Sequence, residues 1–80
     1  MKSKITSLNT LPLGKMAVVS DLTASGTERQ RMLDLGLVRG ASVEALHKSP
    51  AGDPTAYYVM GAVIALRGED ARKILIEDSI

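Results

Sequence analysis

The chain has 80 residues, a formal net charge of +1, no cysteine, no phenylalanine and no tryptophan. A domain of this length buries only about 60 to 65% of its unfolded surface, so we expect one core of aliphatic side chains and little room for a deep cleft. The near-neutral charge gives no long-range attraction for nucleic acid or acidic lipid, and the missing cysteines exclude disulfides and thiolate sites and favour the reducing cytoplasm.

The polar N-terminal segment 1–10 is expected to be frayed at the start of a single domain that spans residues 1–80. Leu8, Leu11 and Leu13 are available to cover one end of that domain. The N-terminus lacks the apolar stretch of a signal peptide. The longest nearly apolar run also falls far short of the ~20 residues that span a bilayer, so we expect no transmembrane segment.

Met16–Leu22 is rich in Val and Leu and predicts the first strand. A short helix should follow, beginning near Thr27, because Thr27 and Gln30 fit a capping box. Ser25 and Glu28 fit the same pattern. We favour Thr27, since the other choice places a glycine in the first helical turn, where its backbone entropy opposes the helix.

The helix should end at Gly36, a residue that adopts the left-handed conformation without a Cβ penalty. Met32, Leu33 and Leu35 then form its buried stripe. Gly40 marks a second turn shortly afterwards.

Four further segments are rich in Val, Ile, Leu and Tyr and bounded by turn residues, which predicts strands. They are Ser42–Lys48, Thr55–Met60, Ala62–Arg67 and Ile74–Glu77. In the first of them Val43, Ala45 and His47 share one face, but both faces carry apolar residues, so the inward face stays open. The turn-forming segment 49–54 and Gly61 should connect antiparallel neighbours.

Gly68–Lys73 resembles a single helical turn, with acids at its start and Lys73 four residues after Glu69. The elements together predict a mainly β fold: a small five-stranded antiparallel SH3-like barrel, with one short helix between the first two strands and a helical turn before the last. An oligonucleotide-binding barrel has its helix later in the chain. The expected core includes Val19, Leu33, Leu35, Val43, Ile64 and Leu66.

Few side chains suggest a ligand site. His47 has Glu44 and Asp53 near it in sequence, but structural metal sites need three or four convergent ligands, so we assign no metal. Tyr57 and Tyr58 should point to opposite faces of their strand, and two tyrosines are too few for a groove that binds proline-rich peptides.

Arg29, Arg31 and Arg39 form either a basic face for an acidic partner or a solvated surface in which Arg31 pairs with Asp34. The glycines do not form a phosphate-binding loop, and no nucleophile, base and acid set stands out. We therefore expect no enzymatic activity and no cofactor.

Four motifs follow one another between about Leu8 and Ile76: Arg31 in the helix, Leu35-Gly36-Leu37 with Gly40, Gly52-Asp53-Pro54, and Gly61 with Ile64–Arg67. In this order they resemble the FeoA-type ferrous iron transport accessory proteins. The family often places Pro before the second glycine of the turn, where this chain has Arg39. The resemblance implies an SH3-like barrel in the bacterial cytoplasm that acts with the membrane permease FeoB, which carries a GTP-binding domain.

The expected function is that of a non-enzymatic accessory or regulatory protein that docks on FeoB and reaches the membrane only through it, with weak self-association. A stand-alone metal-binding or metal-sensing module is the alternative; a nucleic-acid-binding barrel is disfavoured by charge and by missing stacking aromatics. A partly apolar turn rimmed by arginine is typical of interface cores. The predicted partner surface is Leu37, Val38, Arg39, Pro50, Gly52, Asp53 and Pro54. Alternatively, Leu37 and Val38 cap the barrel end.

Overall fold

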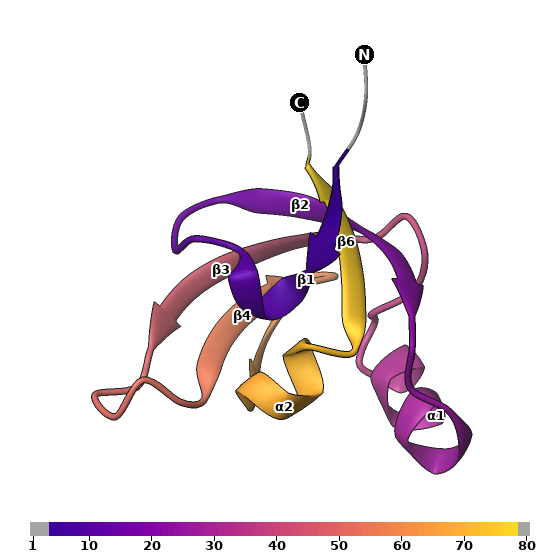
Figure 1. Ribbon diagram of the computed structural model, residues 1–80. Coiled ribbons are helices and arrows are strands. Elements are labelled where there is room, and N and C mark those ends of the chain that lie inside the picture. Colours follow the sequence, from indigo (N-terminus) through magenta and orange to yellow (C-terminus); the bar gives the residue numbers. More distant parts are fainter. Residues whose placement is uncertain (1–3, 79–80) are drawn as a thin grey trace.

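Six antiparallel strands form one curled sheet in the computed structural model, which describes residues 4–78 (Figure 1). The strands are β1 (Ile5–Ser7), β2 (Met16–Leu22), β3 (Ser42–Lys48), β4 (Thr55–Val59), β5 (Ala62–Leu66) and β6 (Ile74–Asp78). Their order in the sheet is β1-β6-β2-β3-β4-β5. The mainly β antiparallel architecture is thus confirmed, with one strand more than the five expected.

The additional strand, β1, lies in the segment expected to be frayed and pairs with β6. A single 3-10 turn, Leu8–Thr10, follows it. Leu8 is fully buried and Leu11 nearly so, whereas Leu13 is exposed. The expectation of fraying is therefore wrong for residues 5–10, because apolar burial at the barrel end holds this segment in place; residues 1–3 lie outside the described range.

Helix α1 (Gly26–Asp34) occupies the predicted place between the strands β2 and β3. It begins one residue before Thr27, with Ser25 as N-cap and no capping hydrogen bond from that side chain. The capping box at Thr27 is therefore wrong. Gly26 has a φ of +63°, which glycine tolerates far better than other residues, so it enters the helix from a left-handed conformation.

The C-terminus of α1 forms a Schellman motif. The N–H of Gly36 donates to the carbonyl of Leu33 at 3.0 Å, and the N–H of Leu37 donates to the carbonyl of Met32 at 3.1 Å. Gly36 takes a φ of +100°, as its predicted role requires. The turn carries Leu37 into the core and leaves Leu35 38% exposed, so the expected burial of Leu35 is wrong.

The core lies inside the curled sheet and contains Val19, Val43 and Leu66 as expected, whereas Leu33 and Ile64 are partly buried and pack against it. Its fully buried large side chains are Leu8, Leu37, Ile74, Ile76, Val19, Val43 and Val59. A register shift between Ala45 and His47 interrupts the pairing of β3 with β4. The strict alternation expected for β3 ends there, and His47 is exposed while Ala45 is buried.

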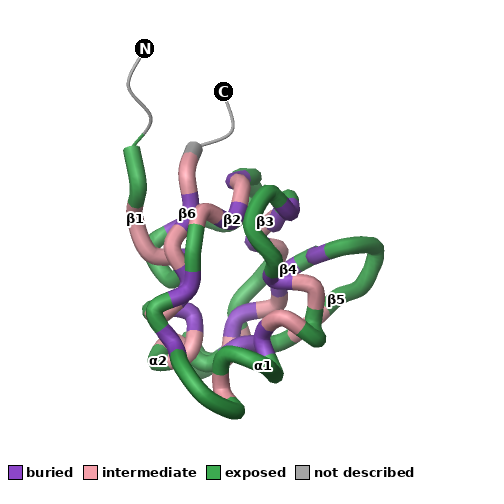
Figure 2. The backbone as a smooth tube through the Cα atoms, turned by 90° about the vertical axis from the view of Figure 1, so that its right-hand side faces the viewer, coloured by how far each residue is buried: buried purple, intermediate pink, exposed green. Residues whose placement is uncertain are grey.

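Both helices lie at the end of the barrel opposite the chain termini (Figures 1 and 2). The short helix α2 (Gly68–Ala71) confirms the single helical turn expected from Gly68 onward, although it ends two residues before Lys73. Lys73 Nζ lies 2.8 Å from the Glu28 carboxylate of α1, so the expected pair with Glu69 is not the one formed. Within residues 4–78 no helix is long and apolar enough to cross a bilayer.

Candidate partner-binding surface

The loop between β3 and β4 is fixed by hydrogen bonds of its own residues and by one to α2. Ser49 Oγ donates to the carbonyl of Asp53 at 2.7 Å. The Asp53 carboxylate accepts the N–H of Gly68 at 2.7 Å, at the first residue of α2, and lies 4.0 Å from Arg67. Asp53 therefore caps α2 and joins two motifs that are separate in the sequence.

The turn between α1 and β3 lies against β2. Arg39 Nε donates to the carbonyl of Ser20 at 3.1 Å, and its guanidinium lies 3.8 Å from the Asp21 carboxylate. The N–H of Gly40 donates to the carbonyl of Val19 at 2.8 Å. The Arg39 side chain remains 78% exposed, so it is oriented by β2 and still accessible to a partner.

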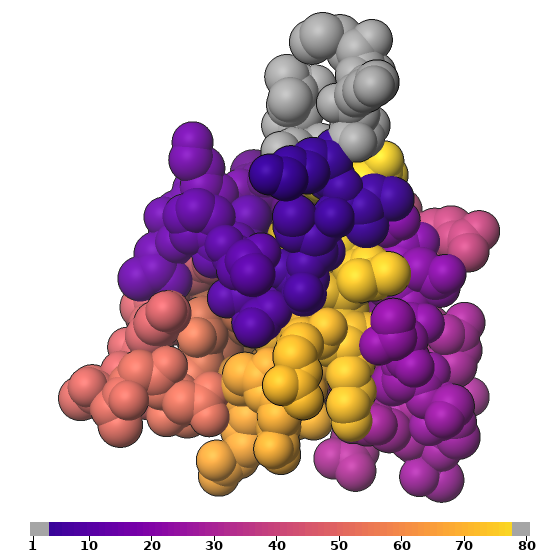
Figure 3. Space-filling view, viewed as in Figure 1, coloured from indigo at the N-terminus to yellow at the C-terminus, as the bar shows by residue number. Residues whose placement is uncertain are grey.

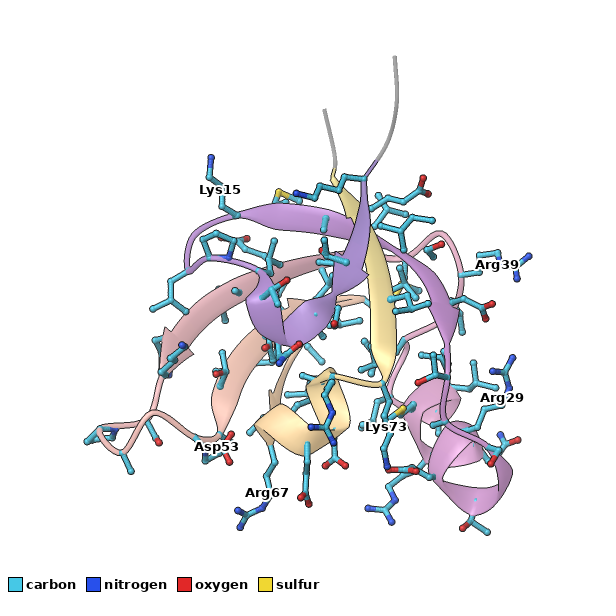
Figure 4. The ribbon with its side chains drawn as sticks, in the orientation of Figure 1. Lys15, Arg29, Arg39, Asp53, Arg67 and Lys73 are labelled. Atoms are coloured by element: carbon cyan, nitrogen blue, oxygen red, sulfur yellow. The ribbon has the colours of Figure 1, made fainter. Side chains whose placement is uncertain are left out.

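The structure does not bring the predicted partner-binding residues onto one surface. Arg39 and Asp53 lie at opposite sides of the molecule, and the loop at 49–54 projects from the side away from α1 (Figures 3 and 4). Leu37 is fully buried, which removes it from any docking surface. Val38, at 38% exposed, stays accessible beside Arg39. Pro50 and Gly52 are exposed and Pro54 is partly buried.

An apolar hollow of about 350 Å³ lies over the outer face of β2, β3 and β4. We define this apolar hollow by Met16, Gly40, Tyr58, Met60 and Gly61 of its lining. Met16 pairs across the strands with Glu44, which in turn pairs with Tyr58, so these side chains share the outer face. Met16, Tyr58 and Met60 are 53%, 47% and 67% exposed, which is a large apolar exposure for neighbouring residues.

The apolar hollow is continuous with the end of α1. A Cβ atom placed on Gly36 would lie 2.9 Å from Met60 Cγ, so the turn after α1 abuts the turn between β4 and β5. Gly40 lines both the apolar hollow and a neighbouring one that contains Arg39. The Val38-Arg39 turn, which directly precedes Gly40, therefore borders the apolar hollow without lining it, and we call this turn the Val38-Arg39 rim.

Sequence reasoning missed Met16 and Met60 as surface residues. The alternation along the strand predicted that Tyr57 and Tyr58 point to opposite faces. This is confirmed, because Tyr57 is only 2% exposed and Tyr58 lies on the outer face. Met60 was expected to end the strand that begins at Thr55. Its φ of +50° instead places it in the turn, directly before Gly61. Its neighbourhood depends on the turn after α1, which is distant in sequence.

The titratable residues of the described part of the chain form no recognisable reactive centre. Within residues 4–78 no three His, Cys, Asp or Glu side chains are grouped to hold a metal ion. Burial raises the pKa of the Tyr57 hydroxyl, against a smaller opposite effect of its hydrogen bond with Thr55. Asp34 accepts a hydrogen bond from Gln30 at 3.0 Å in place of the expected pair with Arg31.

Comparison with known proteins gives consistent matches over most of the chain. The model of the FeoA domain family matches residues 6–78. A fusion of Fe(2+) transport protein A with the Fe(2+) transporter FeoB, from Porphyromonas gingivalis, is 36% identical over 70 residues, which are 88% of this chain and 8% of that protein. The chain therefore spans only a small part of this curated relative.

Two solved structures have the same fold. The solution structure of FeoA from Chlorobium tepidum is 33% identical with a TM-score of 0.87, and the match covers 94% of this chain and 71% of that one. The FeoA of Stenotrophomonas maltophilia, an SH3 domain protein crystallised with zinc, is 31% identical with a TM-score of 0.79, over 89% of this chain and 88% of that one. These matches confirm the expected SH3-like barrel.

Proposed function

This chain belongs to the FeoA domain family, and we propose that it is a non-enzymatic cytoplasmic accessory protein of ferrous iron uptake that docks on a FeoB-type permease. The observation that carries the proposal is the Porphyromonas gingivalis fusion, in which an FeoA-like segment and the FeoB transporter share one chain. A fusion keeps two interacting modules at high effective concentration. We expect the FeoA-like domain of this chain to contact the permease in the same way.

We place the docking surface at the apolar hollow and its Val38-Arg39 rim. Methionine, tyrosine and arginine are enriched at protein interfaces, and the centre of an interface is depleted of charge. Met16, Tyr58 and Met60 provide the apolar contacts, with Glu44 between Met16 and Tyr58 as a charged side chain of the same hollow. Arg39 provides a polar rim that β2 already orients. The Gly52-Asp53-Pro54 loop has a structural role here, since Asp53 caps α2.

The proposal is tested by capture of the permease's cytosolic region on immobilised protein, with and without guanine nucleotide. We expect retention in at least one nucleotide state. A difference between the states would assign the protein to the GTPase cycle, and equal retention would assign it to transporter assembly. No retention in any state, with both partners folded, would overturn the proposed function.

A further inference from the structure

One edge of the sheet is left without a partner strand. Within the described residues β5 pairs only with β4, while β1 forms the opposite edge. All five residues of β5, Ala62–Leu66, are uncharged, none is proline, and they pair with β4 in an unbroken register. Natural edge strands are usually protected by charges, proline or bulges, because a bare edge is a template for another strand. In Figure 2 β5 lies at one side of the barrel.

The hairpin geometry shows which backbone groups are free. Met60 and Gly61 form a two-residue turn with φ of +50° and +83°, the pattern of a type I′ hairpin. The flanking residues Val59 and Ala62 then form a hydrogen-bonded pair, and such pairs alternate with non-bonded ones. The N–H and C=O groups of Val63 and Ala65 therefore point away from β4.

We propose that β5 pairs antiparallel with β5 of a second copy of this chain, with the two-fold axis at Ile64. In this register Val63 of each chain lies opposite Ala65 of the other, and each such pair exchanges two backbone hydrogen bonds. Ile64 faces its own counterpart in a non-bonded pair, where side chains lie closest. The two barrels then share one continuous sheet.

The side chains of β5 suit a second copy. A medium side chain meets a small one at Val63 and Ala65, and no cross-strand pair within the strand brings two charges together. Arg67, the first charged residue after β5, would lie beside Gly61 of the second copy and far from that copy's own Arg67. Ile64, which is only partly buried, would gain apolar cover.

The contact is small, so the dimer must be weak. A pair of five-residue strands buries much less surface than the roughly 800 Å² per partner of a standard interface. The edge is also clear of the apolar hollow, apart from the shared Gly61 turn. We therefore expect self-association that rises with concentration and does not depend on the permease.

The test combines sedimentation equilibrium with amide hydrogen exchange on the full chain. We expect the average mass to rise from one chain toward two as concentration increases. Over the same range the amides of Val63 and Ala65 should become protected, whereas those of Ala62 and Ile64, bonded to β4, should be protected throughout. A mass that stays at one chain, or a dimer that leaves the Val63 and Ala65 amides unprotected, would overturn the proposal.

Two variants locate the contact independently. Ala65→Pro removes an N–H that β4 does not use and should weaken the dimer about tenfold or more. Val63→Lys places a charge at the edge without touching the backbone, and should weaken it in the same direction. Met16→Lys, a matched charge on another exposed apolar site, should leave the dimer unchanged. If Val63→Lys and Met16→Lys change the stability of the dimer equally, β5 does not pair with itself. The same conclusion follows if the Val63 and Ala65 amides become protected only when the permease region is added.

Discussion

At Gly36 a single residue both ends α1 and allows the neighbouring turn to approach. Its φ is +100°, and a Cβ atom would lie 2.9 Å from Met60 Cγ. Gly40 has a similar φ of +91° but nothing within 4 Å of a Cβ atom, so it provides a matched control. A side chain at either position would therefore be strained by the positive φ, and only at Gly36 would it also collide with Met60.

We expect Gly36→Val to lower the free energy of unfolding by more than about 1 kcal/mol, because valine is strained at positive φ. Gly40→Val should cost less, since only the backbone strain acts there. Urea unfolding of both variants measures the difference. Equal losses would show that the contact with Met60 contributes nothing.

The carboxylate of Asp53 acts as a cap on α2, and its loss leaves the N–H of Gly68 without a partner. Asp53→Ala should reduce the free energy of unfolding by about 0.5 to 2 kcal/mol, the usual cost of a lost cap. Asp53→Asn keeps an acceptor oxygen and should cost less. Asp34→Ala, at an exposed site on α1, is the control and should stay within about 0.5 kcal/mol of wild type.

The same variants separate the structural role of Asp53 from partner binding. With a structural role alone, folded Asp53→Asn binds the permease's cytosolic region as wild type does. A large loss of affinity in that variant, with the melting temperature kept, would return the loop to the docking surface.

At the scale of the elements, the contact between Lys73 and Glu28 ties the start of β6 to α1. The hydrogen bond with Glu28 raises the pKa of the Lys73 ammonium, against a smaller opposite effect of desolvation. A raised pKa in the folded state means that this stabilisation is fully present below the unfolded value of about 10.4 and is lost as the pH rises through the folded value.

We therefore expect the difference in unfolding free energy between wild type and Lys73→Met to be constant from neutral pH to about pH 10 and to shrink above it. Comparing two chains that both contain Tyr57 largely cancels the alkaline titration of that residue. Arg72→Met, a neighbouring exposed site, should show no such pH dependence. A difference that is flat up to pH 12 would contradict this role of Lys73.

The strands were predictable because each is bounded by turn residues that act locally. Met16–Leu22 and Ser42–Lys48 have the predicted bounds, and β4, β5 and β6 each differ from the prediction by one residue at the C-terminal end. β1 was not predictable, since three residues carry little pattern and its pairing with β6 joins distant parts of the chain. The predicted start of α1 was wrong because the chain enters the helix at Gly26 with a positive φ. Helix propensity does not describe this backbone requirement.

For the whole molecule, the sequence predicted the fold and family better than the candidate surface. Leu35 and Leu37 flank the same glycine, and only the reversal of the chain after α1 decides which of them enters the core. Asp53 contacts Gly68 across fifteen positions, so its role was not visible in its own motif. Met16 and Met60 become neighbours of one hollow only when β2, β3 and β4 are in register.

We propose that this protein docks on a FeoB-type permease through the apolar hollow. The most direct measurement is titration calorimetry of the permease's cytosolic region with wild type, Met60→Glu and Leu13→Glu. Met60 lies in the apolar hollow, whereas Leu13 is exposed outside it.

We predict that Met60→Glu weakens binding at least about tenfold, because a charge is buried without a partner at the centre of the contact. Leu13→Glu should bind as wild type does, with both variants folded. Equal affinities for all three chains would contradict the docking surface, and no heat of binding for wild type in any nucleotide state would contradict the docking itself.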